Sequence, residues 1–213
     1  MLVLAFDTSA AAVSVDLVEV TDSGAAIVAA QQWTGPHGHS EHLTPTVAAC
    51  LDRAGTTMRD LGALVVGAGP GPFTGLRVGL VSAAAMAEAL DIPAYGVCSL
   101  DGLAPDDGAV LVATDARRKE VYWATYRDGV RLAGPDVDYP ADVDPGEATA
   151  MTGAGARLYA DVLGLPLLVG DHPAPARLVA VALDRVRAGA PSDALTPLYL
   201  RRPDAVVPKV MTR

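Results

Sequence analysis

The sequence predicts an α/β protein built from two related halves. Three observations lead to this fold class: a mixed order of strand and helix patterns, one strand-turn-strand unit that recurs half a chain later, and an apolar content of 51% in 213 residues. A chain of this length and content can bury a sizeable core, in one domain or in two small ones. Only 19% of the residues are charged, which excludes a disordered chain.

The first half reads as three strands, a helix, a strand and a second helix. Its opening apolar run is typical of a central strand buried on both faces, and the next two strands alternate apolar and polar residues. The expected elements are strands at residues 2–6, 13–17, 26–33 and 63–66, helices at 40–54 and 76–90, and a loop rich in glycine and proline at 67–75. Gly55 closes the first helix, whose first turn holds Pro45, with Thr44 as its candidate N-cap.

The second half opens as the first does. A buried strand is expected at residues 110–114, Asp115 ends it, and an alternating strand follows at 121–125. Aligning Asp7 with Asp115 superposes the two units, so we expect a duplicated, domain-sized repeat. The match then degrades, because residues 131–148 are rich in Asp and Pro, and a last helix is expected at 176–188. We therefore divide the chain into a first lobe, residues 1–104, and a reduced second lobe, residues 105–213.

Charge and cysteine content narrow the classes of function. With 16 basic and 25 acidic residues the net charge is -9, so this chain alone is not expected to hold nucleic acid. No signal peptide or membrane span is expected, and Cys50 and Cys98 read as buried thiols of a cytoplasmic protein. Basic residues gather in the last segment, which we expect to be a short flexible tail; they are Arg201, Arg202, Lys209 and Arg213, against Asp204 alone.

The acidic turn Asp7-Thr8-Ser9 follows the first strand. Its carboxylate, hydroxyls and backbone N–H groups suit a phosphate and its metal ion. Alternatively, Asp7 and Ser9 satisfy backbone donors of the turn, and from the tripeptide alone this structural interpretation is favoured.

The segment Gly69-Pro70-Gly71-Pro72-Phe73-Thr74-Gly75-Leu76-Arg77 is far more unusual. Its prolines fix φ and its glycines allow conformations closed to other residues, so the loop is both stiff and specially bent. It leads into a helix, whose free N–H groups, with Arg77 nearby, make an anion site possible. A rigid connection that merely aims the helix is an equal alternative. The segment has neither the ending of a nucleotide-binding P-loop nor the spacing of a dinucleotide fingerprint.

Two further clusters have a functional and a structural interpretation. His37, His39 and His42 with Glu41 invite a metal site, but their spacing is not that of a zinc hydrolase, and a surface loop is favoured. Arg117-Arg118-Lys119 reads as an exposed hairpin turn, with contact to a phosphate or an acidic partner as the alternative. Neither a nucleophile elbow nor an acid/base pair of carboxylates is recognisable, so no catalytic site is predicted.

Five segments in order along nearly the whole chain resemble the TsaB (YeaZ) family. They are Leu-Ala-Phe-Asp-Thr-Ser at 4–9, His-Ser-Glu-His-Leu-Thr-Pro at 39–45, Gly-Pro-Gly-Pro-Phe-Thr-Gly-Leu-Arg at 69–77, Asp-Ala-Arg-Arg-Lys-Glu-Val-Tyr-Trp at 115–123 and Pro-Leu-Tyr-Leu-Arg at 197–201. The loop at 69–77 is the most specific of these, and is shared with the catalytic paralogue TsaD.

This resemblance implies an actin-like, sugar-kinase-like ATPase fold with two ribonuclease-H-like lobes, the second of them reduced. It implies a non-catalytic scaffold for TsaD, which transfers a threonylcarbamoyl group to adenosine next to the tRNA anticodon, together with the P-loop ATPase TsaE. Transfer RNA would be bound only through that complex. TsaD-type enzymes bind their metal through a His-x-x-x-His pair, but the corresponding residues 96–103 contain no histidine, so no metal or cofactor is expected. Residues 153–156 are a candidate remnant of the superfamily's adenosine-binding turn.

The competing hypothesis is an enzyme: a stand-alone ATPase or small-molecule kinase of the same fold, or a protease, as an old family label has it. Asp7 and Asp115 keep the kinase alternative open, since each could face a phosphate or metal from its own lobe.

Under the scaffold hypothesis the two first-lobe helices carry the interface, for a homodimer when the chain is alone and for TsaD when it is present. The residues expected there are Leu43, Val47, Leu51, Gly79, Ala83 and Ala87.

Overall fold

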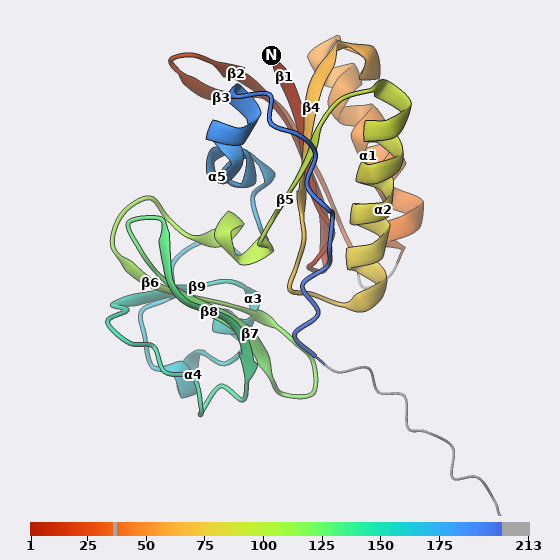
Figure 1. The fold of residues 1–213 in the computed structure, drawn as a ribbon. Helices are drawn as coiled ribbons and strands as arrows, with labels where there is room; N and C mark the ends of the chain where they lie inside the picture. The colour runs from red at the N-terminus through yellow and green to blue at the C-terminus, as the bar shows by residue number, and fades with distance from the viewer. Residues whose placement is uncertain (36–37, 202–213) are drawn as a thin grey trace, which may run out of the picture.

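The first sheet forms the middle layer of the first lobe. The structure, a computed structural model, describes residues 1–35 and 38–201. The sheet has the strand order β3-β2-β1-β4-β5, with β2 antiparallel to β1 and β3, and β4 parallel to β1 and β5 (Figure 1). Its strands are β1 (Leu2–Asp7), β2 (Ala12–Thr21), β3 (Gly24–Thr34), β4 (Leu61–Gly67) and β5 (Ala94–Val97). The buried apolar run of β1 therefore lies at the centre, as predicted.

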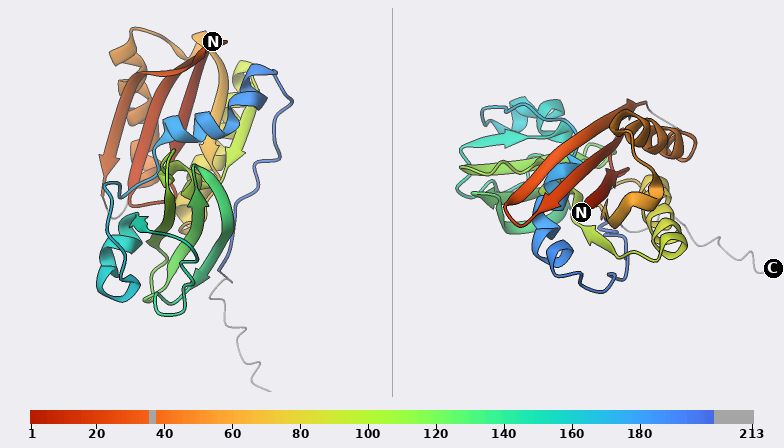
Figure 2. Two further views of the ribbon diagram at one scale, coloured as in Figure 1. Left: turned by 90° about the vertical axis from the view of Figure 1, so that its left-hand side faces the viewer. Right: turned by 90° about the horizontal axis from the view of Figure 1, so that it is seen from above.

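Helices cover both faces of this sheet. Helices α1 (His39–Ala54) and α2 (Phe73–Leu90) lie side by side on one face, where they enclose the larger core cluster (Figure 1). Helix α5 (Pro175–Arg187) lies across the other face, and its apolar stripe packs on β1, β4 and β5 (Figure 2). Burial on both faces explains why the central strands are continuously apolar.

The second sheet repeats the order of the first. Its order is β8-β7-β6-β9, with two antiparallel pairs, as in the first sheet, and one parallel pair where the first sheet has two. Its strands are β6 (Ala109–Asp115), β7 (Val121–Arg127), β8 (Val130–Asp138) and β9 (Ala150–Thr152). No helix intervenes between β8 and β9, whereas α1 stands between β3 and β4. The duplicated and reduced unit expected from the Asp7 and Asp115 alignment is therefore present as topology.

Seven short helices and strands of the described chain were not predicted from the sequence. These elements are the 3₁₀ turns η1 (Met58–Asp60) and η2 (Ser99–Leu103), the helices α3 (Ala154–Leu158) and α4 (Ala160–Leu163), and the strands β5, β8 and β9. β8 lies in the stretch rich in Asp and Pro, where no strand was expected, because pairing with β7 overrides its weak local preference.

Two helix starts were placed too late. α1 begins at His39 with Gly38, at a φ of 100°, as its N-cap, so Thr44 is not the cap and Pro45 lies inside the helix. The glycine C-cap at Gly55, with a φ of 65°, is as predicted. α2 begins at Phe73, three residues earlier than expected, so the loop before it is shorter.

α2 is also long and apolar enough, by composition alone, to cross a membrane. A core helix passes the same test, and here Leu80, Ala83 and Ala87 pack into the first core.

The end of the described chain returns to the first sheet. Residues 190–201 are here called the C-terminal strap. Its first part runs along the edge of β5, with hydrogen bonds between the N–H of Asp193 and the carbonyl of Ala94 and between the N–H of Leu198 and the carbonyl of Ala68. The division expected at residue 104 therefore separates the two sheets, but α5 and the strap belong to the packing of the first.

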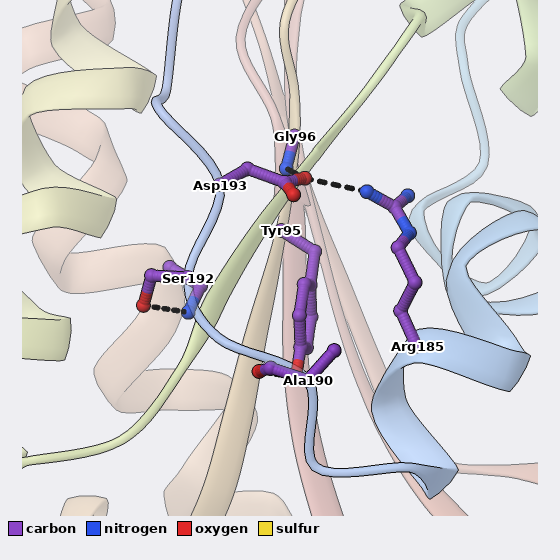
Figure 3. A network of polar contacts seen from close by, with 7 residues as sticks. Tyr95, Gly96, Arg185, Ala190, Ser192 and Asp193 are labelled. Atoms are coloured by element: carbon purple, nitrogen blue, oxygen red, sulfur yellow. Dashed lines mark hydrogen bonds and ion pairs between the residues drawn. The ribbon is translucent and has the colours of Figure 1, made fainter.

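Side chains fix the strap at one point (Figure 3). Asp193 Oδ2 accepts a hydrogen bond from the N–H of Gly96 at 3.0 Å and forms an ion pair with Arg185 of α5. The Tyr95 hydroxyl donates to the carbonyl of Ala190 at 2.7 Å, and Ser192 Oγ accepts from the N–H of Ala94. One carboxylate thus joins β5, α5 and the strap.

We expect Asp193→Ala to lower the free energy of unfolding by about 1 kcal/mol, because the Gly96 N–H and Arg185 lose their shared acceptor. Asp193→Asn should cost less, since its amide oxygen can still accept from Gly96. Asp184→Ala is the matched control, because Asp184 is an exposed aspartate on α5, the helix that also carries Arg185. Urea unfolding followed by circular dichroism measures all three, and equal losses for Asp193→Ala and Asp184→Ala would contradict the assignment.

Candidate functional site

The acidic turn and the Gly-Pro loop meet at the carboxyl end of β1. Asp7, only 1% exposed, accepts hydrogen bonds at Oδ1 from the N–H of Ser9 at 2.8 Å and from its Oγ at 2.7 Å. Its Oδ2 accepts from Ser99 Oγ of η2 at 2.5 Å, and Ser99 Oγ in turn accepts from the N–H of Gly69 at 3.0 Å. Asp7 therefore links the β1 turn, the loop and η2.

Enclosure changes the chemistry of this carboxyl. Burial raises the pKa of Asp7, against the opposing effect of the hydrogen bonds from Ser99 and Ser9. Both oxygens already have protein partners, so Asp7 is not placed to hold a phosphate or its metal ion. The structural interpretation of the turn, in which Asp7 serves its neighbours, fits this geometry better than the phosphate interpretation.

Close backbone packing around Asp7 requires glycine. A Cβ at Gly67 would overlap Oδ2 of Asp7, and one at Gly71 would overlap the carbonyl of Ser9. The Thr8 hydroxyl donates to the carbonyl of Gly75 at 2.8 Å, which brings the first turn of α2 onto the acidic turn. This packing fits the interpretation of the loop as a rigid connection that orients α2.

A cavity of about 530 Å³ separates the two sheets beside this turn. Thr8, Ser9 and Thr74 border it from the first half, and Asp115 with His172 from the second. Ala154, at the start of α3 and within the candidate adenosine-binding remnant, also borders it. Of the two aspartates aligned by the repeat, only Asp115 therefore reaches this space.

The turn after Asp115 is strained. Arg117, Arg118 and Lys119 adopt positive φ angles of 63°, 53° and 68°. Such conformations cost about 1–3 kcal/mol each outside glycine, so neighbouring contacts must hold them. Asp115 Oδ1 accepts from the N–H of Arg117 at 2.8 Å, and the N–H of Glu120 donates to the carbonyl of Arg117 at 2.9 Å. The hairpin turn was predicted, but its conformation was not.

The histidines expected near a metal have other contacts. His39 Nε2 lies 2.7 Å from the carbonyl oxygen of Ala10, and the ring of His42 stacks on Trp33 at 3.8 Å. His37 lies outside the described residues. Within residues 1–35 and 38–201, no group of three His, Cys, Asp or Glu is close enough to hold a metal ion. That no metal is bound stays a prediction.

Arg77 points away from the cavity between the sheets. Its guanidinium carbon lies 3.9 Å from the centre of the Phe73 ring, and its Nε donates to the Tyr199 hydroxyl at 3.3 Å. Phe73 and Tyr199 stack with their ring centres 5.2 Å apart. Arg77 is therefore part of an aromatic cluster with the strap's far end, and not an anion ligand at the acidic turn.

The six residues expected at the partner interface face inward. Gly79 sits against Thr8, where a Cβ would overlap the hydroxyl oxygen. The other five lie in the first core cluster, and they are Leu43, Val47, Leu51, Ala83 and Ala87. These side chains pack within the chain, because the small-residue stripe of α2 lets this helix approach its own sheet closely.

Sequence reasoning missed three residues of these sites. Ser99 lies within residues 96–103, where no motif marks a single serine. His172 borders the cavity with its Nδ1 buried and without a hydrogen-bond partner, and burial lowers its pKa. Tyr199 lies in the family-like segment 197–201, so that segment already held a signal for it.

The family model "TsaD: tRNA N6-adenosine threonylcarbamoyltransferase" matches residues 34–166, more than half of the chain. An uncharacterized protein of Mycobacterium leprae is 51% identical over 205 residues, which are 96% of this chain and 56% of that protein. The tRNA threonylcarbamoyladenosine biosynthesis protein TsaB of Escherichia coli is 39% identical over 133 residues, 60% of this chain and 55% of that protein. This chain thus spans only about half the length of the Mycobacterium leprae relative.

A solved structure extends the likeness to the whole fold. YeaZ from Pseudomonas aeruginosa superposes with a TM-score of 0.76 at 29% identity, covering 93% of this chain and 99% of that one. The fold and its cleft define an α/β protein of the actin-like class. The chain belongs to the TsaB (YeaZ) family.

Asp7→Asn should alter the pH dependence of stability. Because burial raises the pKa of Asp7, the fold favours the protonated carboxyl, which an asparagine mimics. The free energies of unfolding of wild type and variant should be closest below pH 3.8, the ordinary pKa of an aspartate. As pH rises through the raised pKa of Asp7, wild type should lose stability relative to the variant. Urea unfolding between pH 4 and 8 measures the difference, and a difference that does not change with pH would contradict this account.

Proposed function

We propose that this chain is a non-catalytic partner of a TsaD-type threonylcarbamoyltransferase in the formation of N6-threonylcarbamoyladenosine in tRNA. Membership of the TsaB (YeaZ) family supports the process. One observation carries the non-catalytic role: Asp7, where a nucleotide-using enzyme of this fold would need a free carboxylate, is enclosed by Ser9 and Ser99.

The outer face of α2, together with that of α1, is the surface proposed for the partner. On α2, Val81 is 66% exposed, and Ala84, Ala85 and Ala89 are also exposed. Ala48 and Ala49 on the neighbouring α1 continue this small, apolar surface. A helix can approach such a surface closely, because the distance between helix axes follows the side chains at the contact. This places the interface on the two helices first expected to carry it, but on their opposite faces.

The remaining partners follow from the same assignment. The same surface serves a homodimer when the TsaD-type protein is absent, and a TsaE-type ATPase completes the assembly. Transfer RNA is bound by the complex, since a net charge of -9 opposes binding by this chain alone. The complex works in the cytoplasm, without a membrane.

Val81→Glu should weaken association with the TsaD-type protein by more than about tenfold, because it places an unpaired charge in the contact. Val181→Glu is the matched control: Val181 is 48% exposed on α5, which covers the opposite face of the sheet. Co-elution with light scattering measures association, and circular dichroism checks the fold. Equal affinities for both variants would place the interface elsewhere.

The isolated chain should not turn over ATP, whereas adding it to the TsaD-type protein should restore threonylcarbamoyl transfer to tRNA. The reason is that Asp115 stands without a second free carboxylate from the β1 turn. A titration of pure chain with ATP and magnesium decides the first part. Sustained turnover that Asp115→Asn abolishes would favour the stand-alone kinase or ATPase instead.

A further inference from the structure

A second cavity lies next to the one between the sheets, and Pro72, Asp115 and Arg117 border both. It has a volume of about 750 Å³ and opens between the start of α2, the β6–β7 turn and the end of the strap. Phe73, Tyr122 and Tyr199 line it, with Arg117 and Arg201. Volumes of this order are typical of small-molecule sites, and aromatic linings with a few polar groups are typical of them too.

Its aromatic wall is ordered but uncovered. Phe73 and Tyr199 stack at an interplanar angle of 26°, and Arg77 holds both by its contact with the Phe73 ring and its bond to the Tyr199 hydroxyl. Yet Phe73 is 50% exposed and Tyr199 43%. Rings that are fixed by the protein and still half-exposed can take another flat aromatic group without further ordering.

The surroundings are basic, in contrast to the rest of the chain. Arg117 and Arg201 line the cavity, and Arg77 contacts its Phe73 and Tyr199 rings. Arg118 and Lys119 continue the turn of Arg117, and the acidic residues beside these five basic ones are Asp115, which lines the cavity, and Glu120, which pairs with Arg201. Arg201 pairs with Glu120 and donates to the carbonyl of Ala116, which ties the end of the strap to the strained turn. A net excess of three positive charges beside stacked rings favours an aromatic ligand that carries phosphate.

We propose that this cavity holds an unpaired nucleotide of the tRNA, with its base on the Tyr199 and Phe73 stack and its phosphate toward Arg117, which lines the cavity. Stacked rings beside a basic groove are how proteins hold single-stranded nucleic acid without reading its sequence. An acidic peptide would use the charges but leave the ring faces uncovered. This proposal rests on the proposed function, because the complex must bring the tRNA to the site.

The test uses the complex of this chain with the TsaD-type protein and an unmodified tRNA transcript. Tyr199→Ala should lower tRNA affinity by about tenfold, and Tyr199→Phe should retain it, because the ring and not the hydroxyl contacts the base. Arg117→Ala should reduce the slope of log affinity against log salt by about 0.7, because Arg117 lines the cavity. Tyr139→Ala and Arg59→Ala, at exposed positions outside the cavity lining, are the controls. Fluorescence anisotropy measures affinity, and ultraviolet crosslinking should map the RNA to the peptide that contains Tyr199.

Each contrary outcome is distinct. Affinity that Tyr199→Ala leaves unchanged, with no crosslink at Tyr199, overturns the proposal. Loss of co-elution in Tyr199→Ala would make the cavity a protein interface. Binding of AMP that tRNA does not displace would make it a free-nucleotide site. Because Val81→Glu tests association separately, failure of the assembly is not confused with failure of this site.

Discussion

The buried carboxylate of Asp7 is the constraint on which the first half depends. It accepts from Ser9 on its own turn and from Ser99 of η2, which in turn accepts from the loop at Gly69. Leaving such donors without an acceptor costs about 1–3 kcal/mol each, so the turn, the loop and η2 hold their positions together. The absence of a side chain at Gly67 makes room for the carboxylate. The loop is therefore stiff because it surrounds a fixed polar group.

Helix α2, which is fixed to the Asp7 turn, has three surface regions with different surroundings. Its inner stripe, at Gly79 and Ala83, packs on Thr8 and the first core. Its outer stripe, at Val81, is exposed and is the surface proposed for a protein partner. Its first turn, at Phe73, enters the aromatic wall of the basic cavity. Because Thr8 binds the carbonyl of Gly75, the three regions are held in one fixed orientation.

The sequence predicted elements whose causes are local and missed those whose causes are distant. The apolar run of β1, the glycine that ends α1 and the repeat of Asp7 at Asp115 are local or pattern signals, and the structure bears them out as elements. Which face of α2 turns inward depends on Thr8, and the contact of Ser99 with Asp7 spans 92 positions. No periodicity encodes such contacts, so the stripe at Ala83 was assigned to a partner when it serves the chain's own sheet.

Charge determines how the two proposed surfaces must cooperate. At physiological salt the Debye length is about 8 Å, so the basic residues around Tyr199 attract phosphate only at close range. Beyond that distance the net charge of -9 opposes RNA. Under the proposed function this chain therefore does not capture tRNA from solution, but fixes a nucleotide that another subunit has brought near. The two proposals together then require that the outer face of α2 is occupied before the cavity has a ligand, which would make the chain a dependent partner.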